Sequence, residues 1–150
     1  MEERHDIIIV GAGASGLMCG YLLGRAGRDV CVVEKNKLAG KKLLATGNGR
    51  CNFTNRHMSE NCYFGDPEFI RTILHQADDR TVIQLFEEIG IYHRERDGYC
   101  YPYSGQASTV VELLVDRCVE QGVQFRFDTK VSKILHKSGE YVIHCKYGDC

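Results

Sequence analysis

The stretch that decides the fold is residues 6–35, DIIIVGAGASGLMCGYLLGRAGRDVCVVEK. It opens at 6–10 with an apolar, β-branched run, which is typical of a strand buried on both faces. A glycine-rich turn leads into an expected helix at 14–27, and a second apolar strand follows at 29–35. The residues expected on the buried side of the helix are Leu17, Met18, Leu22 and Leu23. Strand, helix and strand within about 30 residues predict a βαβ unit and a parallel sheet.

The turn between the first strand and the helix carries a chemical motif. Gly11, Gly13 and Gly16 form G-x-G-x-x-G, and Glu34 ends the next strand. In this pattern the first glycine permits a tight turn, the second lets backbone approach a pyrophosphate, and the third lets helix and strand pack closely. Glu34 is placed to accept hydrogen bonds from a ribose, and its charge disfavours the 2′-phosphate of NADP. The motif predicts FAD or NAD without distinguishing them; a glycine-rich turn with no ligand is the alternative.

A second unusual segment is GKKLLATGNGRCN, residues 40–52, with three glycines, two asparagines and three cationic side chains. Asn48 and Gly49 favour positive φ. This composition fits a polar hairpin or Ω-loop at the surface, and it also fits a backbone cradle around an anion. The segment follows the strand that ends in Glu34, so it begins at the carboxyl edge of the sheet, where open α/β folds bind ligands. Its position favours the cradle.

The rest of the chain adds helices and hairpins to the βαβ unit. Residues 36–66 are rich in glycine and asparagine, and we expect a long functional loop there. The other expected elements are helices at 67–77, 79–90 and 106–122, a hairpin at 91–103 turning at Asp97-Gly98, a strand at 123–127, and two strands at 130–147 joined by a Ser-Gly turn. This order predicts an α/β, Rossmann-like FAD/NAD(P)-binding fold with a parallel sheet, a helical excursion and β-hairpins, interrupted by an insertion.

Composition excludes several classes of partner. The length of 150 residues suits one domain, and the net charge of -1 disfavours a nucleic acid or an anionic membrane held by bulk charge. No apolar run approaches the roughly 20 residues that span a bilayer. The N-terminus lacks the basic and apolar regions of a signal peptide. We therefore expect a cytoplasmic protein with a small-molecule substrate, no nucleic-acid partner and no membrane partner; the oligomeric state is not predicted.

The cysteines and histidines do not predict a metal site. The eight cysteines are scattered without a C-x-x-C pair, so eight free thiols are expected. Cys51, His57 and Cys62 are the closest approach to a metal-ligand set, but they lack a second pair. The isolated histidines His57, His75, His93 and His136 are expected to be structural or at the surface. No catalytic residue is predicted.

A run of alternating tyrosines lies in the expected hairpin, at Tyr99, Tyr101 and Tyr103. Their spacing of two residues places them on one face of a strand. We expect this face to pack against the protein. A wall beside a flavin or a substrate is the alternative.

Four stretches together resemble the N-terminal part of the BaiN-like flavoproteins, also called NAD(P)/FAD-dependent or aminoacetone-oxidase-family oxidoreductases. They are GAGASGLMCGYLLGRAGRDVCVVEK, GKKLLATGNGRCNFTN, YCYPYSGQASTVVELL and GVQFRFDTKVSKI, in this order along the chain. The resemblance spans essentially all 150 residues. It extends more broadly to flavoproteins with two dinucleotide-binding domains, similar to glutathione reductase. It implies that residues 1–150 are the N-terminal portion of an FAD-binding domain whose remainder and substrate domain lie beyond Cys150.

The resemblance also implies roles for particular residues. The pyrophosphate of FAD would be held by Gly11, Gly13, Ala14, Ser15 and Gly16, and the adenosine ribose by Glu34 and Lys35. The flavin side would be lined by Lys42, Thr46, Gly47, Asn48, Gly49, Arg50, Cys51 and Asn52. Backbone groups of Val131 would bind adenine. Cys51 has no cysteine partner in its loop, so no disulfide-reductase mechanism is implied, and we expect it to pack beside the chemistry.

Three functions remain open from the sequence. The first is an FAD-dependent oxidoreductase that transfers hydride between NAD(P)H and a small organic substrate through bound flavin. The second is an NAD-binding Rossmann dehydrogenase domain without flavin. The third is a non-catalytic dinucleotide-binding module. The 40–52 segment favours the first, because simple NAD domains continue from the ribose acid into ordinary βα units.

Overall fold

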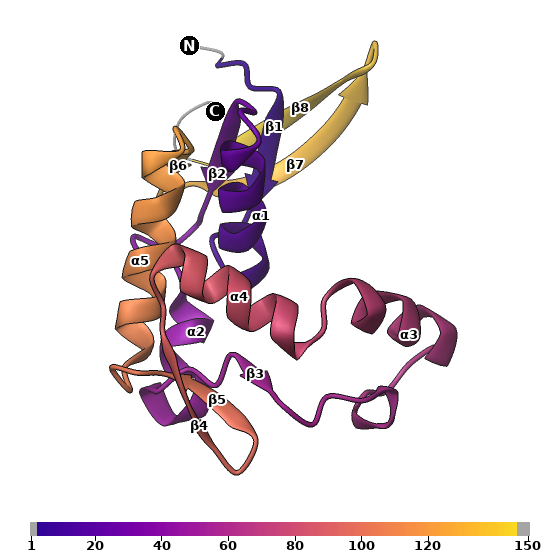
Figure 1. Ribbon diagram of the computed structural model, residues 1–150. Coiled ribbons are helices and arrows are strands. Elements are labelled where there is room, and N and C mark those ends of the chain that lie inside the picture. Colours follow the sequence, from indigo (N-terminus) through magenta and orange to yellow (C-terminus); the bar gives the residue numbers. More distant parts are fainter. Residues whose placement is uncertain (1–2, 147–150) are drawn as a thin grey trace. The chain divides into compact units, whose positions relative to one another are not determined.

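The computed structural model describes residues 3–146 (Figure 1). The chain forms two compact units, one made of residues 1–43 and 114–150 and the other of residues 44–113. We call the first the α/β unit and the second the inserted unit. The α/β unit consists of segments that precede and follow the inserted unit in sequence. This confirms the expectation that an insertion interrupts the α/β core.

The α/β unit is built on a parallel sheet of β1 (Ile7–Val10), β2 (Val30–Val33) and β6 (Gln124–Arg126) in the order β1-β2-β6. Helix α1 (Ala14–Arg25) connects β1 to β2. All four residues of β2 are buried, as its apolar sequence predicts for the middle strand. The order matches strands 1, 2 and 3 of a doubly wound sheet. The predicted βαβ unit is confirmed. The expectation that β1 is buried on both faces is wrong, because β1 is the end strand of this sheet within the described residues, its first three residues are half-buried, and Val10 is 52% exposed.

The buried face of α1 differs from the expected one. The buried residues are Leu17, Gly20, Tyr21 and Gly24, whereas Leu22 is 42% exposed. Glycines let the helix approach its neighbours closely: a Cβ atom at Gly20 would lie 3.4 Å from Val32 Cγ2, and one at Gly24 would lie 2.7 Å from Val123 Cγ2. The expectation failed because it counted only apolar side chains, and the contact surface of α1 is made partly of glycine backbone.

Two alanine substitutions test this packing. Gly24→Ala is expected to destabilise the protein by about 1–3 kcal/mol, because the new Cβ overlaps Val123. Gly20→Ala is the matched control in the same helix, since its Cβ would make ordinary contacts and alanine favours helix by roughly 1 kcal/mol. Urea unfolding of both variants measures the difference. Equal stability of the two variants would contradict the packing described here.

The α/β unit also contains an antiparallel hairpin of β7 (Lys130–Lys137) and β8 (Glu140–Lys146). The turn between them has positive φ at Ser138 (52°) and Gly139 (85°). The register shifts between Val131 and Lys133. The Ser-Gly turn predicted from the sequence is confirmed.

The inserted unit contains short elements where the sequence predicted only a loop at 36–66. The short elements within 36–66 are the end of α2 (Lys41–Ala45), the 3₁₀ turns η1 (Thr46–Gly49) and η2 (Glu60–Cys62), and β3 (Thr54–Asn55). The elements after residue 66 are α3 (Pro67–Gln76), α4 (Asp79–Ile89), β4 (His93–Arg96), β5 (Tyr99–Pro102) and the start of α5 (Ala107–Glu120). Its sheet has the order β3-β5-β4. The loop prediction was wrong because elements of two to five residues leave no hydrophobic period to detect.

Local sequence explains the ends of the longer elements in this unit. Asp66 and Asp78 cap α3 and α4 by accepting backbone hydrogen bonds, and Gly90 ends α4 with φ of 99°. Asp97 and Gly98 have φ of 53° and 81° and join β4 to β5. The helices and the hairpin predicted at 67–103 are confirmed.

The cysteine expectation holds only in part. Cys19, Cys31, Cys51, Cys62, Cys100 and Cys118 are free thiols. Cys145 is disulfide-bonded, so the expectation of eight free thiols is wrong there, and Cys150 lies outside the described residues. Within residues 3–146 no helix is both long and apolar enough to cross a bilayer.

Candidate functional site

The glycine-rich turn of the α/β unit is closed by backbone contacts that exclude side chains. Gly11 has φ of 103°, and its N–H donates to Val33 O at 2.8 Å. A Cβ atom at Gly16 would lie 1.9 Å from Gly11 O, far inside van der Waals contact. The tight turn expected at Gly11 and the close approach expected at Gly16 are therefore both confirmed.

The N-terminus of α1 lies open at this turn. Gly13 is the N-cap and has no side chain to cap the helix, and no acidic residue occupies the first turn. A Cβ atom at Gly13 would meet nothing within 4 Å. The first N–H groups of an α-helix have no acceptor within the helix, and they carry the positive end of its dipole. The geometry of this end, at Ala14 and Ser15, suits a phosphate group.

Glu34 lies beside this turn and is only 8% exposed. Its Oε2 accepts a hydrogen bond from the Ala12 N–H at 2.8 Å. Its Oε1 accepts two from Asn36, one from the backbone N–H at 2.8 Å and one from Nδ2 at 2.5 Å. Burial alone would raise the pKa of this carboxyl, but the three hydrogen bonds outweigh burial and lower the pKa. The side chain is therefore an ionised acceptor that ties the end of β2 to the glycine-rich turn.

The connection from β6 to β7 runs alongside the end of β2. The Asp128 N–H donates to Asn36 O at 3.1 Å, and the Thr129 N–H donates to Glu34 O at 2.9 Å. Val131 follows two residues later at the start of β7, and Lys35 is exposed between the bonded residues. The α/β unit thus brings the residues predicted for the pyrophosphate, ribose and adenine into one region of backbone contacts.

Three contributors to this region were missed from the sequence. They are the N–H of Ala12, the side chain of Asn36, and the N–H of Gly40, which donates to Ala12 O at 2.7 Å. An amide side chain two residues after a strand-ending acid can reach back to the carboxylate, and this local signal could have drawn attention to Asn36. The backbone contacts depend on tertiary structure, and no residue type marks them.

In the inserted unit, residues 46–52 form a compact turn with an unusual backbone. Positive φ angles occur at Gly47 (55°), Asn48 (59°), Gly49 (81°) and Cys51 (58°). The positive φ predicted at Asn48 and Gly49 is confirmed. The first four residues of the turn form η1, so the segment is not the hairpin that was one of the alternatives. Left-handed backbone at a residue that is not glycine costs energy and is often found at functional sites.

Backbone contacts hold this turn together. The Cys51 N–H donates to Thr46 O at 3.0 Å, and the Arg50 N–H and Nε both donate to Gly47 O at 3.2 Å. A Cβ atom at Gly47 would lie 2.9 Å from Asn52 N, so this position also requires glycine. The turn is therefore a defined structure rather than a featureless loop.

Cys51 is buried within the inserted unit. It is 1% exposed, and burial raises the pKa of its thiol although a hydrogen bond with Thr46 acts in the opposite direction. A buried thiol of raised pKa is a poor nucleophile. The burial agrees with the expectation that Cys51 packs, and its place beside the chemistry stays a prediction.

The tyrosine prediction was wrong about which face of β5 is buried. Cys100 and Pro102 are the buried residues, whereas Tyr99 is 47% and Tyr103 is 72% exposed. Buried and exposed residues do alternate as predicted, but the tyrosines occupy the exposed positions. Tyrosine is amphipathic and tolerates either face of a strand, so its spacing alone does not identify the buried face. Tyr101 lies under Arg50, whose guanidinium carbon is 5.3 Å from the ring centroid. The tyrosine face of β5 is thus the open one, as the wall alternative requires.

The predicted site residues fall into two groups. The α/β unit brings together Gly11, Gly13, Ala14, Ser15, Gly16 and Glu34. Lys35 follows Glu34 in sequence, and Val131 lies two residues after Thr129, whose N–H donates to Glu34 O. The inserted unit brings together Thr46, Gly47, Asn48, Gly49, Arg50, Cys51 and Asn52. Lys42 is exposed on α2, which joins the two units in sequence. Among the described residues no His, Cys, Asp or Glu cluster has the arrangement of a metal site, and Cys51, His57 and Cys62 do not form one.

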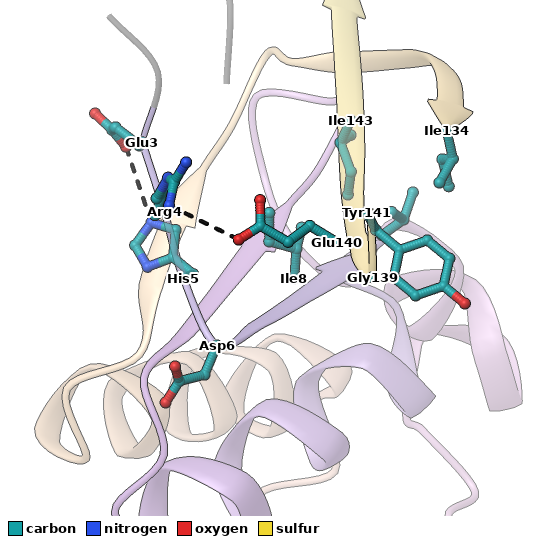
Figure 2. A pocket seen from close by; sticks show the side chains of 11 residues that line it. Glu3, Arg4, His5, Asp6, Ile8, Ile134, Gly139, Glu140, Tyr141 and Ile143 are labelled. Carbon is teal, nitrogen blue, oxygen red and sulfur yellow. Dashed lines mark ion pairs between the residues drawn. The ribbon is translucent and has the colours of Figure 1, made fainter. Parts of the chain in front are cut away.

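A separate cavity of about 520 Å³ lies in the α/β unit (Figure 2). Residues before and within β1 line one side of it, and the β7–β8 hairpin lines the other. Figure 2 shows ion pairs from Arg4 to Glu140 (3.7 Å) and from His5 to Glu3 (3.9 Å). None of the predicted site residues lines this cavity. Ile8 and Val10 lie two residues apart in β1, so their side chains share one face of the strand, and the cavity lies between that face and the hairpin.

Comparisons with known proteins agree with this geometry. Residues 5–149 match the family described as HI0933-like protein Rossmann domain. A 3-dehydro-bile acid delta(4,6)-reductase of Clostridium scindens is 39% identical over 142 residues, which are 93% of this chain and 35% of that protein. A ribosomal RNA dihydrouridine synthase of Escherichia coli is 37% identical over 134 residues, which are 88% of this chain and 33% of that protein. The chain spans about a third of the length of these curated relatives.

Solved structures share the fold. The 3-ketosteroid-delta4-(5alpha)-dehydrogenase from Rhodococcus jostii RHA1, in complex with 4-androstene-3,17-dione, aligns with a TM-score of 0.76 and 16% identity. The alignment covers 97% of this chain and 42% of that chain. At this identity the likeness concerns the fold alone, and it confirms the predicted Rossmann-like α/β class.

Proposed function

The chain belongs to the HI0933-like family, whose Rossmann domain binds FAD, and from this premise we propose that the protein is an FAD-dependent oxidoreductase. The membership confirms the flavoprotein family that the sequence resembles. The observation that carries the proposal is the uncapped N-terminus of α1, open at Gly13, beside the buried and ionised carboxylate of Glu34. A helix N-terminus next to a strand-ending acid is the arrangement that binds the pyrophosphate and ribose of an adenine dinucleotide.

The residues of the α/β unit fit the adenosine and pyrophosphate half of FAD. N–H groups at the start of α1 would bind phosphate oxygens, and the space at Gly13 admits them without a side chain in the way. Glu34 would accept a ribose hydroxyl, and backbone groups near Val131 would bind adenine. The residues proposed for the flavin side are Lys42, Thr46, Gly47, Asn48, Gly49, Arg50, Cys51 and Asn52.

Bound FAD supplies two-electron chemistry, and the protein binds, orients and polarises its ring system. Arg50 is suited to polarising it, because its position is fixed by Gly47 O and by the ring of Tyr101. A fixed positive charge stabilises the negative charge that a flavin gains on reduction. Lys42 is a second cation in the same segment of sequence. The buried thiol of Cys51 supports the turn and takes no part in electron transfer.

The substrate class proposed is a small molecule with a reducible carbon–carbon double bond. Two relatives, a delta(4,6)-reductase and a dihydrouridine synthase, have names that describe hydrogen added to such a bond. NAD(P)H is the proposed donor of the hydride. The near-neutral charge of the chain favours a small molecule over RNA. Reduction of uridine-containing RNA, with no turnover of small enones, would contradict this choice.

The test of the proposed function is a flavin and reduction assay on the full-length protein. The purified protein is expected to carry FAD, to lose its yellow colour when NADH or NADPH is added under anaerobic conditions, and to regain it with an enone acceptor. A colourless protein that binds NAD but no FAD would support the dehydrogenase alternative. A yellow protein that neither donor reduces would support a non-catalytic module.

Arg50→Ala tests the polarising role. Removing the positive charge is expected to make the flavin potential more negative by about 30 mV, which corresponds to about 1.4 kcal/mol for a two-electron couple. Arg71→Ala is the matched control, because Arg71 pairs with Glu60 outside the segment. Dye-linked reductive titration measures both potentials. An unchanged potential in Arg50→Ala would count against this role.

A further inference from the structure

We propose that Asn36 is a positioning residue of the ribose site: it saturates one oxygen of Glu34, so that only Oε2 accepts a hydroxyl from the adenosine ribose. This inference rests on the proposed FAD binding. It departs from the simplest expectation for a strand-ending acid, in which the two carboxylate oxygens accept both ribose hydroxyls.

The count of hydrogen bonds on the carboxylate carries the argument. An ionised carboxylate has about four lone-pair positions, two on each oxygen. Both positions of Oε1 are taken by Asn36, through its backbone N–H at 2.8 Å and its Nδ2 at 2.5 Å. Within residues 3–146, Oε2 accepts only the Ala12 N–H, at 2.8 Å. One position therefore remains for a ligand, and it belongs to Oε2.

The orientation of the Asn36 amide is fixed by chemistry. The side-chain atom nearest Oε1 must be the nitrogen, because an amide oxygen there would face a carboxylate oxygen with no proton between them. Hydrogen bonds to an ionised acceptor are about twice as strong as those between neutral groups. The side chain of Asn36 is therefore held firmly against Oε1.

The backbone of Asn36 is fixed from the opposite side as well. Its carbonyl oxygen accepts from the Asp128 N–H at 3.1 Å, and the neighbouring Thr129 N–H donates to Glu34 O at 2.9 Å. Thr129 Oγ1 in turn donates to Phe127 O at 2.9 Å. The connection from β6 to β7 thus holds the backbone of residues 34–36, and with it the Asn36 N–H that donates to Oε1.

The test uses FAD and two analogues whose adenosine carries a 2′-deoxy or a 3′-deoxy ribose. Quenching of flavin fluorescence by the flavin-free full-length protein gives each dissociation constant. In the wild type, one analogue is expected to bind about tenfold more weakly than FAD, and the other within about twofold, because a single hydroxyl donates to Glu34. Equal weakening of both analogues would overturn the proposal.

Asn36→Ala removes Nδ2 but keeps the backbone N–H, so it frees one of the two positions on Oε1. The second hydroxyl then gains an acceptor, and the difference between the two analogues is expected to shrink below about threefold. A residue with a merely structural role would lower the melting temperature and leave that difference unchanged, and this result would also overturn the proposal. Asn55→Ala is the control, because Asn55 bonds only the His57 N–H of the inserted unit through its side chain. Failure of the wild type to bind FAD would overturn the proposed function together with this inference, whereas FAD binding without analogue selectivity would overturn the inference alone.

Discussion

Gly16→Ala is expected to destabilise the protein by about 3 kcal/mol and to weaken FAD binding by more than about a hundredfold, or about 2.7 kcal/mol. The new Cβ would lie 1.9 Å from Gly11 O, and both partners in this contact belong to backbone that cannot rotate away. Either α1 must move away from β1 or the turn must open. Both changes displace the helix N-terminus from the phosphate position. Urea unfolding and FAD titration measure the two effects.

Gly13→Ala separates cofactor binding from folding. Gly13 has φ of -84° and ψ of -170°, which alanine adopts readily, and its Cβ would meet no protein atom within 4 Å. The flavin-free protein is therefore expected to keep its stability within about 0.5 kcal/mol. FAD is expected to bind at least about tenfold more weakly, because the Cβ occupies space that the pyrophosphate requires. Unchanged FAD affinity in Gly13→Ala would show that no ligand approaches this turn.

Glu34→Gln is the second substitution with a large expected effect. The glutamine oxygen can replace only one oxygen of the carboxylate, so its NH₂ group must face the N–H of either Ala12 or Asn36. A buried donor left without an acceptor costs about 1–3 kcal/mol, and hydrogen bonds to a charged acceptor are lost in addition. We expect the flavin-free protein to lose about 2–3 kcal/mol of stability. Glu112→Gln, at an exposed position of α5, removes the same charge and serves as the control.

The effect of Glu34→Gln should depend on pH in a defined direction. The pKa of Glu34 is lowered in the folded protein from its ordinary value of 4.5, because hydrogen bonds from Asn36 and Ala12 outweigh burial and Lys35 adds a favourable charge. The unfolded chain therefore binds the proton more readily, and the stabilisation by Glu34 is complete above pH 4.5 and is lost as pH falls through the folded pKa. The stability gap between wild type and Glu34→Gln should be wide at pH 7 and should narrow below pH 4.5. A gap that widens in acid would contradict the ionised state assigned to Glu34.

The parts of the fold that sequence predicted correctly depend on local rules. The run at 6–10, the glycines at 11, 13 and 16, and the acid at 34 specify the βαβ unit because each has a steric or polar requirement that few other residues meet. The caps at Asp66 and Asp78 and the turn at Asp97-Gly98 are local in the same sense. Such features can be predicted without knowing what packs against them.

The features that sequence missed depend on contacts between distant parts of the chain. The buried face of α1 includes Gly20 and Gly24, and a search for apolar side chains does not find glycines. These glycines pack against Val32 and Val123, which lie far away in sequence. The positive φ of Cys51 has no marker, because cysteine rarely adopts it and only the surrounding bonds impose it.

The bonds around Glu34 show the same limit within the candidate site. The acid itself was predicted from its place at the end of a strand. Its partner Asn36 was not, because its role depends on the link from β6 to β7 that holds it in place. The sequence therefore predicted the acid proposed to bind the ribose but not the residues that orient it.

The most direct test of the central claim is a titration of the purified, flavin-free full-length protein with FAD, followed by flavin fluorescence. We expect saturable binding of one FAD per chain, with about tenfold or greater weakening in Gly13→Ala at unchanged stability. Absence of FAD binding to the folded wild-type protein would contradict the proposed function.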